Sequence, residues 1–167
     1  SLEGIFAFSL TDIWLTSSFP IHGDGNNWTL YHLQDMGISA SVSKIWGTSS
    51  TDIYFVGRGG SIVHSNGTNW LKVESGTATN ISGIFGIENP FTNREEIYCA
   101  VTSFFQPQDK KILKITDVNK VDTIRWDTGR DVSSLWTKNG IPIYTCGDGI
   151  FENLHGFWKE INRKARI

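Results

Sequence analysis

The sequence predicts an all-β protein of the β-propeller class, with four four-stranded blades in this chain. The first observation is a segment with a central aromatic residue that occurs four times, at Phe6, Trp46, Phe85 and Trp136. These anchors lie 40, 39 and 51 residues apart, and a period of about 40 residues is typical of four-stranded propeller blades. The second observation is the composition, since 17 Gly, 7 Trp and 10 Phe indicate short strands, tight turns and aromatic packing.

Each repeat begins with two expected strands. The aromatic anchor lies on the first strand, and the second strand follows after a turn. Three repeats keep an eight-residue step between equivalent apolar positions of the two strands: Ile5 to Ile13, Ile45 to Ile53 and Leu135 to Ile143. The third repeat is longer because of an insertion at 89–93, where a loop is expected.

The third and fourth strands of each repeat are expected to form a hairpin. Asp24-Gly25 and Asn66-Gly67 predict tight turns in the first two repeats, with positive φ at both central residues. In the third repeat, 111–115 is expected to pair with 122–126 across a longer connection. In the fourth, 150–161 has the same hairpin length, with its glycine moved by one place.

The predicted blades are residues 1–42, 43–82, 83–133 and 134–167, within a single propeller domain or propeller fragment that covers 1–167. An immunoglobulin-like sandwich has similar strand spacing. It gives no reason for a superimposable repeat of this length, so the propeller is the preferred interpretation.

The best-preserved repeat, from Ile45 to Trp70, reads I-W-G, D-I-Y-F-V-G, G-S-I-V-H and N-G-T-N-W in order. It resembles bacterial secreted and cell-surface β-propellers with I-W-G and D-G-x-x-W (WG-type) repeats, which are related to Asp-box and photosystem II assembly-factor-like propellers. The resemblance covers the whole chain and implies a secreted or cell-surface location. The turn from Asp24 to Trp28 is one residue shorter than an Asp-box, so no catalytic residue of the sialidases is transferred.

Members of these families usually have roughly six to eight blades. The repeat here starts at an innermost strand and stops after an outermost one, which leaves two sheet faces to be covered. Three arrangements therefore stay open: four blades close on themselves, two copies complete one ring, or the chain is part of a larger propeller.

Aromatic residues that recur at equivalent positions are expected to pack between blades, because a repeat needs its core residues in every copy. The set comprises the four anchors Phe6, Trp46, Phe85 and Trp136 and the hairpin residues Trp28, Trp70 and Trp158. Asp12 and Asp52 precede the second strand in two repeats. Their carboxylates are expected to accept hydrogen bonds from backbone N–H groups of the turn, which is a structural role.

Candidate ligand-binding residues lie in the loops that join second to third strands, where propellers usually bind ligands. Arg58 and Asp148 occupy matching places in their blades and could present charge. Phe104 and Phe105 lie in a longer loop of the third repeat, where exposed aromatic side chains would suit a sugar or a protein.

Several classes of function are not expected. The net charge is -2 and the cations are scattered, which disfavours nucleic acid as a partner. Membrane insertion is not expected, since no stretch approaches the ~20 apolar residues of a spanning helix. His22 and His64 lie in different blades without further ligands, so no metal or cofactor is predicted. Cys99 and Cys146 are expected to be two buried free thiols.

The preferred function is a non-catalytic binding or scaffold module whose partner is a protein or a glycan. One alternative is a glycoside-processing enzyme with its acid and base among Asp35, Asp109, Asp131 and Asp148. Another is a structural set of blades whose partner is a second copy or the remainder of a longer chain. No catalytic residue is assigned.

Overall fold

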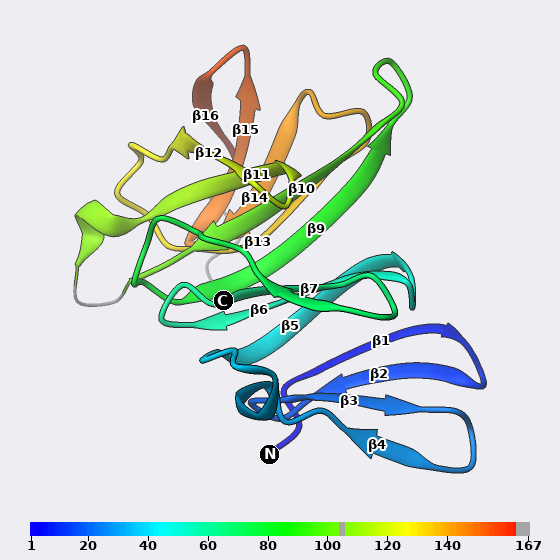
Figure 1. Ribbon diagram of the computed structural model, residues 1–167. Coiled ribbons are helices and arrows are strands. Elements are labelled where there is room, and N and C mark those ends of the chain that lie inside the picture. Colours follow the sequence, from blue (N-terminus) through cyan, green and yellow to red (C-terminus); the bar gives the residue numbers. More distant parts are fainter. Residues whose placement is uncertain (104–105, 163–167) are drawn as a thin grey trace. The chain divides into compact units, whose positions relative to one another are not determined.

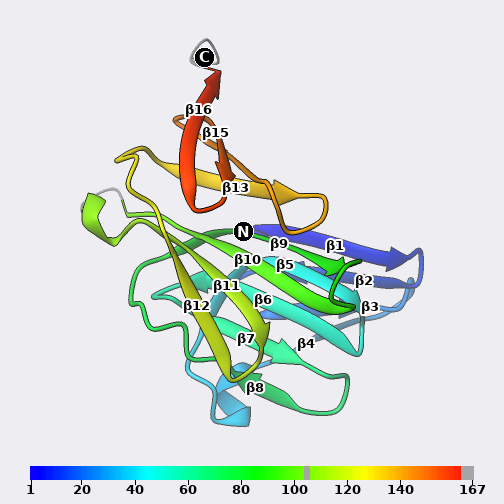
Figure 2. The same ribbon diagram turned by 90° about the horizontal axis from the view of Figure 1, so that it is seen from above.

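The computed structural model describes residues 1–103 and 106–162. In this part of the chain, sixteen strands form four antiparallel sheets of four strands each (Figure 1). The strands of every sheet neighbour one another in chain order, as Figure 2 shows from a second direction. The all-β fold with four four-stranded blades is thereby confirmed.

Two compact units divide the chain, Ser1–Asn80 and Ile81–Ile167, and each contains two sheets. We call the sheets blades 1 to 4. Blade 1 contains β1 (Gly4–Ser9), β2 (Asp12–Thr16), β3 (Pro20–Gly23) and β4 (Trp28–Leu30). Blade 2 contains β5 (Ser41–Ser49), β6 (Asp52–Arg58), β7 (Ile62–Ser65) and β8 (Trp70–Lys72).

The second unit contains the other two blades. Blade 3 contains β9 (Ile81–Asn89), β10 (Arg94–Val101), β11 (Lys111–Asp117) and β12 (Lys120–Arg125). Blade 4 contains β13 (Val132–Thr137), β14 (Ile143–Gly147), β15 (Gly149–Leu154) and β16 (Phe157–Asn162). Two 3₁₀ helices, η1 (Leu33–Met36) and η2 (Pro107–Asp109), are the helices among the described residues. No helix described is long and apolar enough to span a membrane.

One register is repeated in all four blades. An aromatic residue of the first strand lies opposite an aromatic residue of the second, which lies opposite a polar residue of the third. These cross-strand ladders are Phe6–Trp14–His22, Trp46–Tyr54–His64, Phe85–Tyr98–Lys114 and Trp136–Tyr144–Glu152. Residues directly opposite one another share a sheet face, so each ladder marks the same face of its blade.

The core of the first unit lies between blades 1 and 2. Trp14 of blade 1 is buried, and its ring centroid lies 5.4 Å from that of Phe55 and 6.1 Å from that of Trp70. Gly4 allows the innermost strands to approach, because a Cβ added there would lie 2.6 Å from the carbonyl oxygen of Ser43. The two blades therefore pack face to face through aromatic side chains.

The second unit repeats this arrangement between blades 3 and 4. Its core contains Tyr98 and Ile112 of blade 3 together with Leu135 and Phe151 of blade 4. Gly83 takes the place of Gly4, since a Cβ added at Gly83 would lie 2.5 Å from the Ser133 carbonyl oxygen. The same close approach of innermost strands is therefore built into both units.

The outer hairpins differ from the prediction in one respect. Of the turn residues Asp24-Gly25 and Asn66-Gly67, the glycines have positive φ, 93° and 86°, and the other two do not. The backbone N–H groups of Asn26 and Asn27 donate to Asp24 Oδ1 at 2.8 and 2.7 Å, and Asn66 accepts two equivalent bonds. These hydrogen bonds lower the pKa of Asp24. The prediction of a turn with two positive φ angles was wrong, because the side chain of the first residue organises a longer loop.

The third blade pairs more regularly than expected. Residues 111–115 do pair with the 122–126 region, since Lys111 lies opposite Arg125 and Ile115 opposite Val121. The pairing continues to Asp117 and Lys120, so the connection is a short turn and the expected longer connection was wrong. A hairpin can therefore close here without an Asn-Gly or Asp-Gly dipeptide.

The repeated aromatic residues are not equally buried. Phe6, Trp46, Phe85, Trp70 and Trp158 are partly buried. Trp28 and Trp136 are 53% and 49% exposed, and so differ from the expectation of a core position. Trp28 covers Gly23 of its own blade, where an added Cβ would lie 2.5 Å from the Trp28 ring.

Candidate functional site

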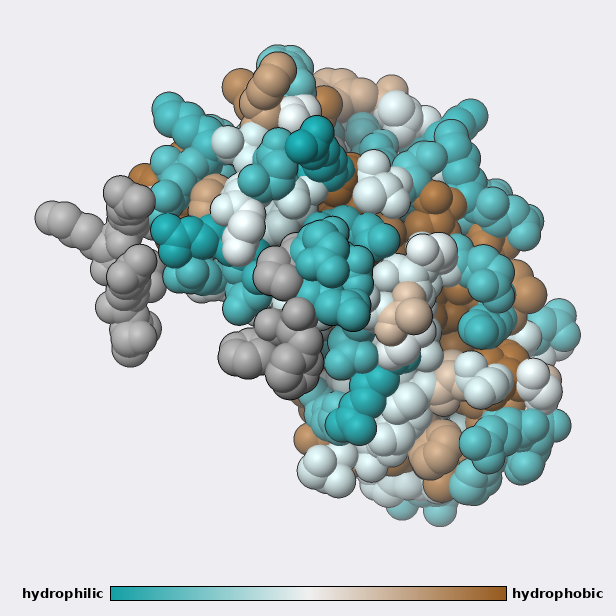
Figure 3. Space-filling model, turned by 90° about the vertical axis from the view of Figure 1, so that its left-hand side faces the viewer, coloured by the Kyte–Doolittle hydropathy of each residue, from teal (hydrophilic) through white to brown (hydrophobic). Residues whose placement is uncertain are grey.

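Candidate sites are described for each unit by itself, at the loops between second and third strands and at the link from one blade to the next. Figure 3 shows the left-hand side of Figure 1. Hydrophilic residues make up most of this side, with smaller hydrophobic areas between them (Figure 3). Each unit contributes its own set of polar contacts.

In the first unit, Arg58 ends β6 and its side chain is 68% exposed. Its guanidinium Nη2 lies 3.6 Å from Glu3 Oε1. The next backbone N–H, that of Gly59, donates to Asn80 Oδ1 at 3.0 Å. Arg58 is thus a charged group on the surface with a weak, solvent-exposed ion pair.

In the second unit, Asp148 follows β14 and accepts a hydrogen bond from Arg130 Nη1 at 2.8 Å. This contact with Asp148 raises the pKa of Arg130. A second ion pair lies in the same loops, where Lys110 Nζ is 2.6 Å from Asp131 Oδ1 and 3.5 Å from the Gly129 carbonyl oxygen. Two cations and two carboxylates therefore converge at the blade 3 to blade 4 link.

A groove of about 620 Å³ runs beside these pairs along β11 and β12. Its lining residues are Gln108, Lys110, Lys111, Thr123, Arg125, Trp126, Asp127 and Gly129. Trp126 is buried beneath it, and its Nε1 donates to the Arg130 carbonyl oxygen at 2.7 Å. Lys110 is paired with Asp131, and Arg125 Nε lies 3.8 Å from Asp127 Oδ2, so the excess positive charge of the groove comes from Lys111.

Sequence reasoning named Arg58 and Asp148 but missed the two cations, Lys110 and Arg130. A second repeat, in which Lys72-Val73-Glu74-Ser75-Gly76 matches Arg125-Trp126-Asp127-Thr128-Gly129, places Arg130 directly after a turn, but it gives no signal for Lys110. In both copies a hydroxyl accepts a backbone N–H two residues later, and the glycine has φ of 69°. The repeat fixes where the blade link turns. Phe104 and Phe105, the other predicted binding residues, lie outside the described residues.

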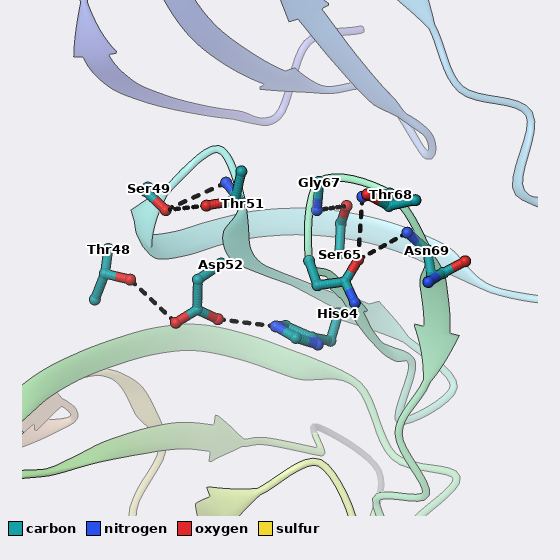
Figure 4. A network of polar contacts seen from close by, with 10 residues as sticks. Thr48, Ser49, Thr51, Asp52, His64, Ser65, Gly67, Thr68 and Asn69 are labelled. Carbon is teal, nitrogen blue, oxygen red and sulfur yellow. Dashed lines mark hydrogen bonds and ion pairs between the residues drawn. The ribbon is translucent and has the colours of Figure 1, made fainter.

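The two aspartates at the start of the second strand have a different partner from the one expected. His22 Nε2 donates to Asp12 Oδ1 at 2.9 Å, and His64 Nε2 donates to Asp52 Oδ1 at 2.8 Å. In the turn of blade 2, a serine accepts the hydrogen bond from the backbone N–H, since Thr51 N donates to Ser49 Oγ at 3.2 Å (Figure 4). The expected bonds from turn N–H groups to these carboxylates were wrong, because the third strand brings a better donor within reach.

The Asp12 carboxylate also joins the two blades of the first unit. Ser50, in the first turn of blade 2, donates from its hydroxyl to Asp12 Oδ1. Trp14 Nε1 donates in turn to Ser50 Oγ at 2.7 Å. No group of three or more His, Cys, Asp or Glu residues with the arrangement of a metal site occurs among the described residues.

Blade 3 has an acidic network at the equivalent place. Glu96 is buried, and it accepts from Tyr98 Oη at 2.6 Å and from Asn89 Nδ2 at 3.1 Å. Lys114 Nζ lies 3.0 Å from the same carboxylate. Burial opposes ionisation, but these three contacts outweigh it and the pKa of Glu96 is lowered. Burial and the adjacent carboxylate raise the pKa of Tyr98 well above its ordinary value.

The two cysteines are free, as expected, but they differ in environment. Cys99 is fully buried, and burial raises the pKa of its thiol to about 12. Cys146 is exposed, so the expectation of two buried thiols was wrong for this residue. It lies on the face of β14 that bears Tyr144, and no blade of its unit covers that face.

Thiol labelling checks this difference. In the native single chain, kept dilute, 5,5′-dithiobis(2-nitrobenzoic acid) is expected to modify one thiol per chain within minutes, because the thiolate reacts and burial suppresses both ionisation and access. The second thiol should react only after denaturation. Cys146→Ser is the control and should abolish the rapid phase. Two rapid equivalents per native chain would contradict the burial of Cys99.

No protein-family model and no curated protein matches the sequence. Solved structures do match. A structure of YCF48 bound to D1 peptide is 12% identical, with a TM-score of 0.67, and the match covers 95% of this chain and 52% of that chain. The extracellular domain of the putative one component system BT4673 from B. thetaiotaomicron is 10% identical, with a TM-score of 0.71, over 100% of this chain and 23% of that chain.

A third match, the six-bladed β-propeller lectin of Aleuria aurantia, is 17% identical with a TM-score of 0.43, over 96% of this chain and 61% of that one. The sheets and the first two likenesses together define the class: this chain is a β-propeller protein with four blades. It spans about half, or less, of the length of the first two structures it matches.

Proposed function

We propose that this chain is a non-catalytic binding or scaffold module of a secreted or cell-surface bacterial protein, and that it holds a protein or glycan ligand on its loop side. The observation that carries the proposal is the positively charged groove beside the Lys110–Asp131 and Arg130–Asp148 pairs. The pairs hold the loops in place. The cations of the groove then favour a ligand with acidic groups, whether sugar or peptide.

The similar structures support this proposal in a general way. One of them is a propeller with a bound peptide, and another is an extracellular domain. Propellers support many unrelated functions, so the fold alone does not choose the ligand. The choice of an acidic ligand depends on the groove of this chain.

The glycoside-processing alternative has less support. Two of its four candidate carboxylates are engaged by cations, Asp131 by Lys110 at 2.6 Å and Asp148 by Arg130 at 2.8 Å. A general acid must hold a proton near neutral pH, which usually requires an apolar or acidic surrounding. Asp131 and Asp148, each beside a cation, do not have such a surrounding.

Binding assays test the proposal. The 167-residue chain is applied to an array of sialylated, sulfated and neutral glycans and to a set of Glu-rich peptides. We expect acidic probes to bind, and Lys111→Glu combined with Arg125→Glu to weaken that binding by about tenfold or more, because like charges then face the ligand. The matched control is Lys44→Glu with Lys72→Glu in the first unit, which should leave the affinity unchanged. Blank arrays, or equal loss in both variants, would contradict the proposed groove.

A further inference from the structure

Blades pack through two different faces in this protein. We call the face that bears the aromatic ladder the trailing face, and the opposite one the leading face. In the first unit, the trailing face of blade 1 meets the leading face of blade 2, where Ile45, Phe55 and Val63 lie opposite one another and are buried. The second unit has the same pairing, in which Tyr98 of blade 3 packs with Leu135 and Phe151 of blade 4.

Blade 1 has a leading face that no blade of its unit covers. Ile5, Leu15 and Ile21 lie opposite one another at the positions of Ile45, Phe55 and Val63. Ile5 is 71% exposed, whereas Ile45 is 8% exposed. A hollow of about 540 Å³ opens beside Ile5 and Leu15. The face has the apolar composition of an interblade surface without the neighbouring blade.

Blade 4 has an uncovered trailing face. Trp136 of its ladder is 49% exposed. Cys146, two residues beyond the ladder residue Tyr144, is exposed, whereas the equivalent Thr16 and Ala100 are fully buried in blades 1 and 3. A hollow of about 180 Å³ lies over Trp136, Tyr144, Cys146 and Ile150. This trailing face is the kind of surface that packs on a leading face inside each unit, and the leading face of blade 1 has no such partner in its unit.

We propose that the occupant of both faces is a second copy of this chain, with the trailing face of blade 4 of each copy packed on the leading face of blade 1 of the other. Two such contacts, related by a two-fold axis, join two copies into a closed dimer. Two copies supply eight blades, within the range of roughly four to eight that propellers use.

The interface inside the first unit predicts which residues meet. Thr16 Oγ1 of blade 1 donates to the Ser43 carbonyl oxygen of blade 2 at 2.9 Å. Cys146 has the place of Thr16, and Glu3, two residues before Ile5, has the place of Ser43, two before Ile45. Docking therefore brings Cys146 of one copy next to Glu3 of the other.

Position 134 sets how closely the docked strand can approach. Ser134 stands where blades 1 and 3 have Gly4 and Gly83. A Cβ added at Gly4 or Gly83 would lie 2.6 or 2.5 Å from a carbonyl oxygen of the next blade. The docked strand must therefore lie farther from β13 than β5 lies from β1.

The test is a cross-link across the proposed contact. In the full 167-residue chain carrying Glu3→Cys, mild oxidation is expected to join Cys146 of one copy to the new thiol of the other, and non-reducing electrophoresis should show a dimer. Light scattering of the unmodified chain should give twice 18.7 kDa. Leu10→Cys is the control, because Leu10 is exposed at the far end of the β1–β2 hairpin and should give no cross-link. Replacement of Cys146 by serine should abolish the cross-linked dimer on the gel and leave the scattering mass at two copies.

Other results would overturn the proposal. A cross-linked monomer would mean that blade 4 docks on blade 1 of its own chain, and species larger than a dimer would mean an open filament. A monomer without any cross-link would mean that the partner is not a second copy. Ile5→Glu provides an independent check: it changes an exposed side chain, so circular dichroism should be unchanged while the scattering mass falls from two copies to one.

Discussion

Replacement of Phe55 by alanine is expected to lower the free energy of unfolding of the first unit by about 3–5 kcal/mol, because the change leaves a large cavity in a packed core. Phe55 is fully buried on β6. Its ring centroid lies 5.4 Å from that of Trp14 in blade 1 and 5.6 Å from that of Trp70. The lost ring therefore weakens blade 2 and its contact with blade 1 together.

Urea denaturation followed by hydrogen-exchange mass spectrometry is the appropriate measurement, since the exchange of β6 and β7 peptides reports the first unit separately. Phe91→Ala is the matched control. It makes the same chemical change at an exposed loop position of the second unit, and should alter stability by no more than about 0.5 kcal/mol. Similar losses in the two variants would mean that Phe55 is not part of a packed interblade core.

The fold could be predicted because its signal is repeated. Periodic anchors such as Trp46 and Phe85, and strand pairs at a fixed step, recur in copies that support one another. Details that occur only once were harder to predict. The β11–β12 turn has no glycine and was expected to be longer, and Trp136 was placed in the core although no neighbouring blade of its unit covers it. Whether a face is covered depends on the neighbour and not on the residue itself.

The candidate site could be predicted only in part. The loop positions of Arg58 and Asp148 could be predicted because they follow from the repeat, and their role in binding stays a prediction. Their partners were not found, because Arg130 and Lys110 reach the site from a link and a loop that have different lengths in different blades. The Asp12–His22 pair was missed for a related reason. Cross-strand register determines that contact, and the register becomes visible only when Trp14 is seen opposite His22.

The ladder also explains why the third strand can change its residue from blade to blade. Blades 1 and 2 pair an aspartate with histidine, and blade 3 pairs Glu96 with Lys114, so both solutions place a nitrogen donor beside a carboxylate. In blade 4, Tyr144 Oη donates to Glu152 at 3.0 Å, and this bond raises the pKa of Tyr144. All four blades therefore satisfy the carboxylate at this place with a donor, although the residue types differ.

Replacement of Glu96 by glutamine is expected to destabilise the second unit by about 2–3 kcal/mol at neutral pH. The variant keeps the shape of the side chain but removes the charge that Lys114 Nζ contacts at 3.0 Å. Its amide can accept only one of the bonds from Tyr98 and Asn89 in good geometry. The Lys114 ammonium group, which lies over the Tyr98 ring at 5.5 Å, loses its main partner.

The same residue should make the second unit sensitive to acid. The pKa of folded Glu96 lies below its ordinary value of 4.5, so its contribution to stability is present above that pH and is lost as the pH falls through the folded pKa. In the wild type, the free energy of unfolding from β10 amide exchange should therefore decrease as the pH falls below 4.5. Glu96→Gln should flatten this dependence, whereas Glu88→Gln, at an exposed position of β9, should leave it intact. An unchanged slope in Glu96→Gln would show that other carboxylates control the acid response, and that the buried network contributes through packing alone.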